Sequence, residues 1–247
     1  MQVAWENSLP TRKFYLNDVQ LKLCTPNSKA KYTINNLTNQ VGLGFASWID
    51  NWVDQSSLVI DVGANFGVVS IYSALKKQCK VVAFEPHFGT YYCFYRNIIA
   101  NRLQNCIYPF QLALSTSSGF TNKFDISDAT AGRALNSLIP NSDSCVNSDL
   151  KRLQREKLGL SNQEEDVRSK AQMFQCTQFT SLDTFMMMFK EPAINSSVKH
   201  LKVDIDGLDL LVLAGAVNTL NDVKTIYTIR HGHSCANLLK KKEYLVR

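Results

Sequence analysis

A glycine-spaced turn follows a short apolar run near residue 60. The run at 58–60 leads through Asp61 into Val-Gly-Ala-Asn-Phe-Gly at 62–67. A buried strand that passes through such a turn into a helix is typical of α/β proteins that bind nucleotides or nucleosides. Gly63 allows a tight turn and lets a ligand lie against the main chain, and Gly67 lets the helix pack close to the sheet. We therefore assign a ligand-binding role to four residues: Asp61, Gly63, Asn65 and Gly67.

A carboxylate stands at the matching place after the next apolar run. Glu85 follows Val-Val-Ala-Phe at 81–84 and precedes Pro86. At the end of the second strand of a doubly wound sheet, a carboxylate can accept hydrogen bonds from both hydroxyls of a ribose. The turn and Glu85 together predict a nucleoside-type ligand. We interpret the neighbouring His87 as a solvated loop residue.

The acid in the turn indicates which nucleoside is bound. A dinucleotide site uses G-x-G-x-x-G and directs a helix N-terminus at a pyrophosphate. Here Asp61 ends the strand and small residues follow it. A carboxylate in this place suits the positively charged amino end of S-adenosylmethionine better than a pyrophosphate.

Two further carboxylates end a later strand, expected over 201–205. Asp204 and Asp206 should lie at the same sheet edge as the turn, because the carboxyl ends of parallel strands share one edge. One of them is our candidate for a general base, or both hold substrate hydroxyls or a divalent ion. The alternative is that they cap the helix expected from 208 to 220, a role that suits Asp209 best. Lys202 is expected to point to the other face or to extend towards solvent.

The elements that position these residues alternate between strand and helix. Apolar runs predict strands at 58–60, 81–84, 107–114, 201–205 and 224–229, with helices at 66–77, 88–101, 208–220 and 234–242. This order predicts a mostly parallel, doubly wound α/β sheet with helices on both faces. Residues 1–55 form a lead-in with a hairpin and a short aromatic helix. An insertion at about 115–175 includes a charged helix at 150–170, and a strand at 174–179 leads to a helix capped by Ser181.

Composition is that of an ordinary globular protein. Hydrophobic residues make up 45% of the 247 residues and charged residues 19%, and the net charge of +6 requires no acidic partner. The basic residues are dispersed without an aromatic platform, so we expect no nucleic acid partner. Seven cysteines form no metal-ligand spacing, and we expect reduced thiols in a cytoplasmic protein without a signal peptide or membrane span. The sequence does not predict an oligomeric state.

Four motifs together resemble the FkbM methyltransferases. They are the turn at 60–67, Phe-Glu-Pro at 84–86, Ser-Leu-Asp at 181–183 and Leu-Lys-Val-Asp-Ile-Asp-Gly-Leu-Asp at 201–209. The resemblance implies a Rossmann-like class I methyltransferase domain at 56–247, with S-adenosylmethionine as cofactor and no metal assigned. It also implies methyl transfer to a hydroxyl, often on a sugar or small metabolite. Asp206 and Asp209 stand where the family usually has glutamates, which shortens the reach of each carboxylate by one methylene.

The segment at 225–237 differs from that family. Its Arg230-His231-Gly232 resembles the opening strand of the histidine phosphatases, in which such a turn supplies a phosphate-binding arginine and a nucleophilic histidine. The methyltransferase resemblance also implies seven strands, of which the last two would lie beyond residue 243. Two alternatives therefore stay open: a truncated fusion with a phosphatase-like segment, and a non-catalytic module that keeps the fold.

Overall fold

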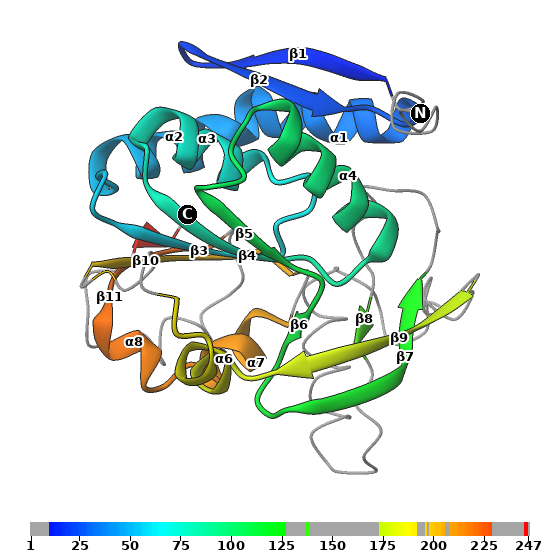
Figure 1. The fold of residues 1–247 in the computed structure, drawn as a ribbon, viewed down its shortest axis with the longest axis vertical. Helices are drawn as coiled ribbons and strands as arrows, with labels where there is room; N and C mark the ends of the chain where they lie inside the picture. The colour runs from blue at the N-terminus through cyan, green and yellow to red at the C-terminus, as the bar shows by residue number, and fades with distance from the viewer. Residues whose placement is uncertain are drawn as a thin grey trace.

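A parallel sheet lies at the centre of the computed structural model, which describes residues 10–126, 137–138, 173–191, 196, 198–205, 208–228 and 245–246. Its strand order is β12-β11-β10-β3-β4-β5 (Figure 1). The bounds are β3 Leu58–Val62, β4 Lys80–Phe84, β5 Ile107–Phe110, β10 Lys199–Val203, β11 Val223–Thr228 and β12 Leu245–Val246. Each adjacent pair is parallel. The predicted α/β sheet with helices on both faces is confirmed.

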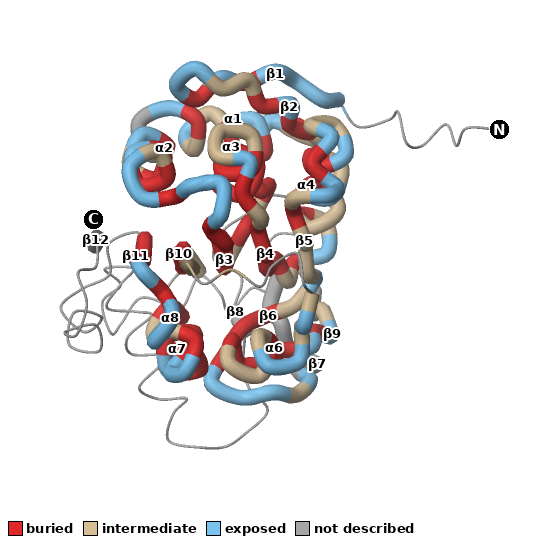
Figure 2. Tube along the Cα trace, turned by 60° about the vertical axis from the view of Figure 1, so that its left-hand side comes forward, coloured by how far each residue is buried: buried red, intermediate tan, exposed pale blue. Residues whose placement is uncertain are grey.

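Helices cover both faces because alternate strand residues point to opposite sides. Val59 and Val81 join the core beneath the first group of helices, whereas Ile60 and Val82 join the second core. The first group is α1 Ser28–Thr38, α2 Gln40–Trp52, α3 Val68–Lys77 and α4 Phe88–Ala100. The second group is α6 Leu182–Met188, α7 Asp209–Ala214 and α8 Thr219–Asp222, seen below the sheet in Figure 1. Figure 2 shows the buried strands between these two layers.

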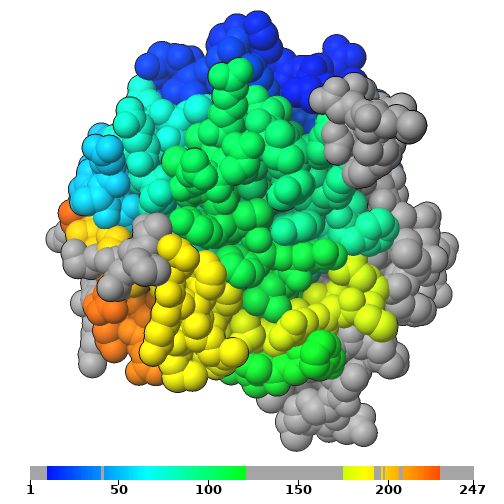
Figure 3. All heavy atoms as spheres, in the orientation of Figure 1, coloured from blue at the N-terminus to red at the C-terminus, as the bar shows by residue number. Residues whose placement is uncertain are grey.

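The lead-in packs into the first core. Its predicted hairpin is present as β1 Thr11–Leu16 and β2 Val19–Cys24, and the predicted aromatic helix is α2, whereas α1 was not predicted. The hairpin covers the top of the molecule in Figure 3. Trp48 of α2 donates a 2.8 Å hydrogen bond to Thr225 Oγ1 of β11. The boundary proposed at residue 55 thus separates two segments that share one hydrophobic cluster.

The insertion forms a second sheet. Its strands are β6 Ala113–Leu114, β7 Gly119–Ile126, β8 Ser137–Leu138 and β9 Met173–Thr180, in the order β6-β9-β7-β8. The single strand predicted at 107–114 is wrong, because β5 stays in the main sheet and β6 pairs with β9. Pro109 has no N–H to donate, so β5 suits the sheet edge, and the chain then turns away. The helix predicted at 150–170 lies outside the described residues.

The single helix predicted at 208–220 is also wrong, because α7 ends at Gly215 and α8 begins after a turn. A Cβ on Gly215 would overlap the Ser115 carbonyl of the insertion, so the helix ends where this backbone approaches. Asp183 of α6 then accepts hydrogen bonds from the N–H groups of Asn218 and Thr219 at 2.9 and 2.7 Å. These bonds satisfy donors at the start of α8, so Asp183 has a structural role. Within the described ranges, no helix has the length and apolar content that a membrane span requires.

We predict that buried His200 makes the protein less stable in acid. Its Nδ1 lies 2.8 Å from Thr225 Oγ1, and burial, together with the charge of Lys224, lowers its pKa to about 4, against a smaller opposite effect of Asp54. The unfolded chain, with a histidine pKa of about 6.5, therefore binds the proton more readily. The stabilisation is complete above pH 6.5 and is lost as the pH falls towards 4, at up to about 1.4 kcal/mol per pH unit.

The measurement is urea unfolding of the native chain and of His200→Gln between about pH 7 and about pH 5. The comparison is needed because a carboxyl with a raised pKa, such as Glu85, changes stability in the opposite direction over the same range. The native chain should lose more stability than the variant. Equal losses would contradict the prediction.

Candidate functional site

The turn after β3 is held by its own hydrogen bonds. Gly63, Asn65 and Gly67 have φ values of +73°, +52° and +77°, which the two glycines adopt without strain. Both Gly63 N–H and Ala64 N–H donate to the Phe84 carbonyl at the end of β4, at 3.0 and 2.9 Å. The next three N–H groups donate to the Glu85 carboxylate, the Asn65 side chain and the Ala64 carbonyl. Because these five amides have protein partners, the turn is not arranged as a phosphate cradle, which fits a ligand without a pyrophosphate.

Both glycines are required by protein contacts. A Cβ on Gly63 would overlap the Asp204 carbonyl, and one on Gly67 would overlap the Phe94 ring of α4. The loop after β10 thus fills the space that a Cβ on Gly63 would take, and a contact between the Gly63 main chain and the cofactor stays a prediction. Gly67 is the N-cap of α3 and allows this helix to begin against α4. Gly63 thus brings the ends of β3 and β10 into contact, and Gly67 brings the start of α3 against the middle of α4.

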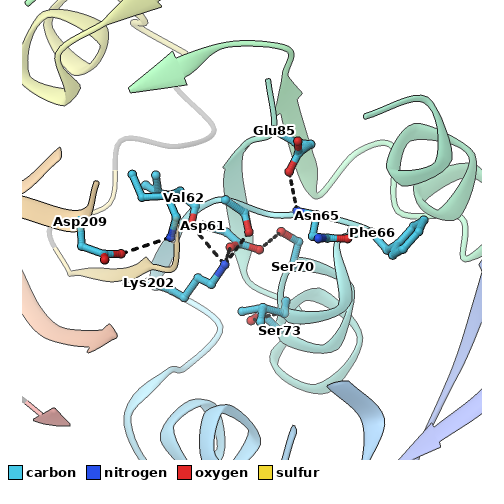
Figure 4. Close-up of polar contacts among 12 residues, drawn as sticks. Asp61, Val62, Asn65, Phe66, Ser70, Ser73, Glu85, Lys202 and Asp209 are labelled. Atoms are coloured by element: carbon cyan, nitrogen blue, oxygen red, sulfur yellow. Dashed lines mark hydrogen bonds and ion pairs between the residues drawn. The ribbon is translucent and has the colours of Figure 1, made fainter. Parts of the chain in front are cut away.

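Asp61 is fully buried and forms an ion pair. Its Oδ2 accepts a 2.6 Å hydrogen bond from Ser70 Oγ of α3, and its Oδ1 lies 3.0 Å from Lys202 Nζ of β10 (Figure 4). Lys202 Nζ also donates to the carbonyl oxygens of Val62 and Gly63, at 3.1 and 2.7 Å. Lys202 lies on the other face of β10 from Leu201 and Val203, as expected, but it does not extend to solvent, because only 4% of it is exposed. A contact between Asp61 and the cofactor stays a prediction.

Glu85 faces the turn from the end of β4. Its Oε2 accepts a 2.9 Å hydrogen bond from Asn65 N–H, and its Oε1 accepts one from His87 N–H at 2.9 Å. It is 8% exposed, and burial raises its pKa to about 7, although both hydrogen bonds and the charge of Lys202 oppose this. A carboxylate has about four lone-pair sites, so Glu85 can accept further hydrogen bonds beyond these two. Hydroxyl donors from a ribose would stabilise its ionised form.

The loop after β10 carries the two candidate catalytic residues. Asp204 N–H donates a 3.2 Å hydrogen bond to the Val62 carbonyl, and the residue is half-buried beside the turn. Asp206 lies outside the described residues. Asp209 accepts a 3.2 Å hydrogen bond from Ile205 N–H and so holds this loop, whereas the helix cap expected of it is not seen, because no side chain among the described residues caps α7. The structure thus brings Asp61, Glu85 and Asp204 together at one edge of the sheet.

One protein family matches most of this chain. The family model described as "Methyltransferase FkbM domain" matches residues 61–237, which is most of the chain and includes the segment around Arg230. The chain belongs to the FkbM methyltransferase family. The predicted family, enzyme class and S-adenosylmethionine cofactor are therefore confirmed.

The similarity of the chain to solved structures is low. P. horikoshii TYW2 in complex with MeSAdo has 20% identity and a TM-score of 0.29, over 43% of this chain and 37% of that chain. The StiE O-MT has 14% identity and a TM-score of 0.27, over 55% of this chain and 44% of that chain. The chain therefore spans less than half the length of either protein. No curated protein matches it.

In this FkbM domain, a glutamine of the insertion holds the loop after Glu85. Gln175 Nε2 of β9 donates to the Pro86 carbonyl at 2.7 Å, and its Oε1 accepts from Phe88 N–H at 3.1 Å. His87, between them, is 1% exposed, and its Nδ1 accepts a 3.2 Å hydrogen bond from Thr90 N–H at the start of α4. The expectation of a solvated His87 is therefore wrong. Sequence reasoning missed Gln175, because no local pattern indicates a contact across 87 or more residues.

A metal centre would require several ligand side chains placed close together. Among the described residues, no group of three or more His, Cys, Asp or Glu side chains is placed to hold a metal ion. The segment with the phosphatase-like Arg230-His231-Gly232, and the helix expected at 234–242, lie outside those residues.

Proposed function

We propose that the chain transfers the methyl group of S-adenosylmethionine to a hydroxyl of a small molecule or glycan, such as a sugar. The observation that carries this is the position of the Glu85 carboxylate, which accepts the N–H of Asn65 in the glycine turn. This arrangement fits a nucleoside whose ribose is bound by Glu85. Asp204, at the end of β10, supports the presence of a base at the same edge. The family membership supports methyl transfer.

In this proposal the protein mainly positions the reactants. Bound S-adenosylmethionine supplies an electrophilic methyl group on a good leaving group. Asp204, or Asp206 in its place, accepts the proton of the acceptor hydroxyl, so that the oxygen becomes more nucleophilic as the C–O bond forms. Asp61, Gly63, Asn65 and Gly67 would shape the cofactor side. Holding the acceptor oxygen in line with the methyl group supplies much of the rate enhancement.

The first test is calorimetric titration with S-adenosylhomocysteine. Glu85→Ala should weaken binding by about 1.5 kcal/mol or more, or about tenfold or more in Kd, since a hydrogen bond to a charged group is lost. Asp222→Ala is the control, because this carboxylate is exposed at the end of α8. Native-like binding by a folded Glu85→Ala would contradict the assignment of Glu85. No binding by the folded native chain would contradict the proposed function and favour a non-catalytic module.

The same titration should depend on pH. Since burial raises the pKa of Glu85 to about 7 in the protein without ligand, the ionised form that accepts ribose hydroxyls is lost below that pH. Affinity should fall by up to about tenfold per pH unit below pH 7 and level off above it. Glu85→Gln should bind more weakly and lack this dependence. An affinity of the native chain that is constant between about pH 6 and about pH 8 would contradict the predicted pH dependence.

We further propose a cytoplasmic location and a partner set without nucleic acid. The cysteines of the described part support the first point, because they are all free thiols: Cys24, Cys79, Cys93, Cys106 and Cys176. Free thiols are typical of a reducing compartment. The dispersed basic residues support the second.

A further inference from the structure

Lys202 connects the two parts of the chain that form the site. Its side chain is 5% exposed, and its Nζ has three acceptors within hydrogen-bonding range: Asp61 Oδ1 and the carbonyl oxygens of Val62 and Gly63. All three acceptors belong to β3 and its turn, whereas Lys202 belongs to β10. The two carbonyl oxygens accept hydrogen bonds from Nζ, and Asp61 Oδ1, 3.0 Å away, is its ion-pair partner. Figure 4 shows the Lys202 side chain directed at this turn.

The carbonyl of Gly63 is the informative acceptor. Gly63 has a φ of +73°, and the loop after β10 fills the space beside its Cα. Its carbonyl is held by Lys202 at 2.7 Å. A lysine that only neutralised Asp61 would not need the two backbone carbonyls. The hydrogen bonds to Val62 and Gly63 instead fix the peptide units from which the turn begins.

Three carboxylates surround this single ammonium group. Asp61 faces it from β3, Glu85 from the loop after β4 and Asp204 from the loop after β10, while α3 contributes the uncharged Ser70 among the described residues. Burial lowers the pKa of Lys202, but the attraction of Asp61, Asp204 and Glu85 outweighs it and raises the pKa above its usual value. Lys202 is therefore charged, and its charge opposes the rise in the pKa of Glu85 that burial causes.

We propose that Lys202 is a positioning residue for methyl transfer: it holds the glycine turn in its cofactor-binding shape. This inference rests on the proposed function of the site. It extends the site by a residue that touches neither reactant and acts through Asp61, Gly63 and Glu85. The Lys202 side chain thus links the strand that carries the candidate base to the turn that receives the cofactor.

The test is the affinity for S-adenosylhomocysteine between about pH 6 and about pH 9. Lys202→Met keeps the apolar stem and removes the charge, and Lys202→Arg keeps the charge. Lys199→Met is the matched control on the same strand, because Lys199 pairs with the exposed Asp222. We expect Lys202→Met to bind about tenfold more weakly or worse at pH 8. We also expect its affinity to fall at a higher pH than in the native chain, by about one unit, since Glu85 loses a neighbouring positive charge.

The outcomes separate this inference from the function on which it rests. Lys202→Arg should recover part of the affinity and the native pH profile, and Lys199→Met should match the native chain in both. A folded Lys202→Met with native affinity and native pH profile overturns the positioning role alone. Failure of the native chain to bind overturns the proposed function, and the inference with it.

A second variant tests the proposal if Lys202→Met does not fold. Lys202→Met leaves Asp61 as an uncompensated buried charge, which can unfold the chain. The double variant Asp61→Asn/Lys202→Met removes both charges of the pair. The comparison is with Asp61→Asn alone, because Asp61 is itself a candidate cofactor residue. Weaker binding by the double variant, with the shifted pH profile, supports the proposal. Binding equal to that of Asp61→Asn overturns it.

Discussion

Replacing Gly63 with alanine should destabilise the fold by about 3 kcal/mol or more. The new Cβ would require an alanine at φ +73° and would overlap the Asp204 carbonyl. Backbone strain of this kind costs about 1–3 kcal/mol, and forcing atoms into a packed site costs a similar amount. Because the obstacle is backbone, no side-chain rotation can relieve it. Urea unfolding of both chains measures the loss, and cofactor affinity should fall with it.

A second glycine provides the matched control for that experiment. Gly44 lies within α2, and a Cβ there would meet only the hydroxyl end of Tyr227. Alanine also favours a helix by up to about 1 kcal/mol relative to glycine. Gly44→Ala should therefore change stability by about 1 kcal/mol or less. If Gly63→Ala were as stable as Gly44→Ala, the contact between the turn and the loop after β10 would be refuted.

Replacing Asp204 with asparagine should slow methyl transfer by about 100- to 10,000-fold, the usual contribution of a general base. Asparagine has nearly the same shape but cannot accept the hydroxyl proton. Affinity for S-adenosylhomocysteine should stay close to native, because Glu85 and the turn are unchanged. The measurement is transfer of labelled methyl groups to hydroxylated acceptors on which the native chain is active.

Asp206→Asn and Asp222→Asn belong in the same experiment. Asp222 is exposed, so its variant should keep the native rate. The two carboxylates after β10 are alternatives for the base. A slow Asp206→Asn beside a normal Asp204→Asn would assign the base to Asp206 and contradict the role of Asp204.

Local sequence patterns predicted the centre of the fold because they report burial directly. The apolar runs before Asp61 and Glu85 are short and are followed by residues that end a strand, which favours strands buried on both faces. The same patterns placed the two carboxylates at one edge, because parallel strands share their carboxyl ends. The sequence therefore predicted the main sheet and the residues around the turn.

Distant contacts explain the predictions that were wrong. Lys202 alternates with apolar residues, but in a strand covered on both faces this pattern does not distinguish a surface lysine from a buried one. Its burial depends on Asp61 and on carbonyls about 140 positions away. Likewise, the expected helix at 208–220 ends at Gly215 because Ser115 approaches it. Neither contact has a local signature.

The contact between Trp48 and Thr225 also constrains how the chain can fold. The two residues are 177 positions apart, and His200 contacts the same threonine hydroxyl. During synthesis β3 and β4 are available to cover much of the lead-in before the insertion is made, but the partners of Trp48 are made only after the insertion. Contacts this distant carry a large loop-closure cost and slow folding. Until β10 and β11 emerge, Trp48 lacks its partners Thr225, His200 and Tyr227, so this part of α2 stays uncovered and open to aggregation in the nascent chain.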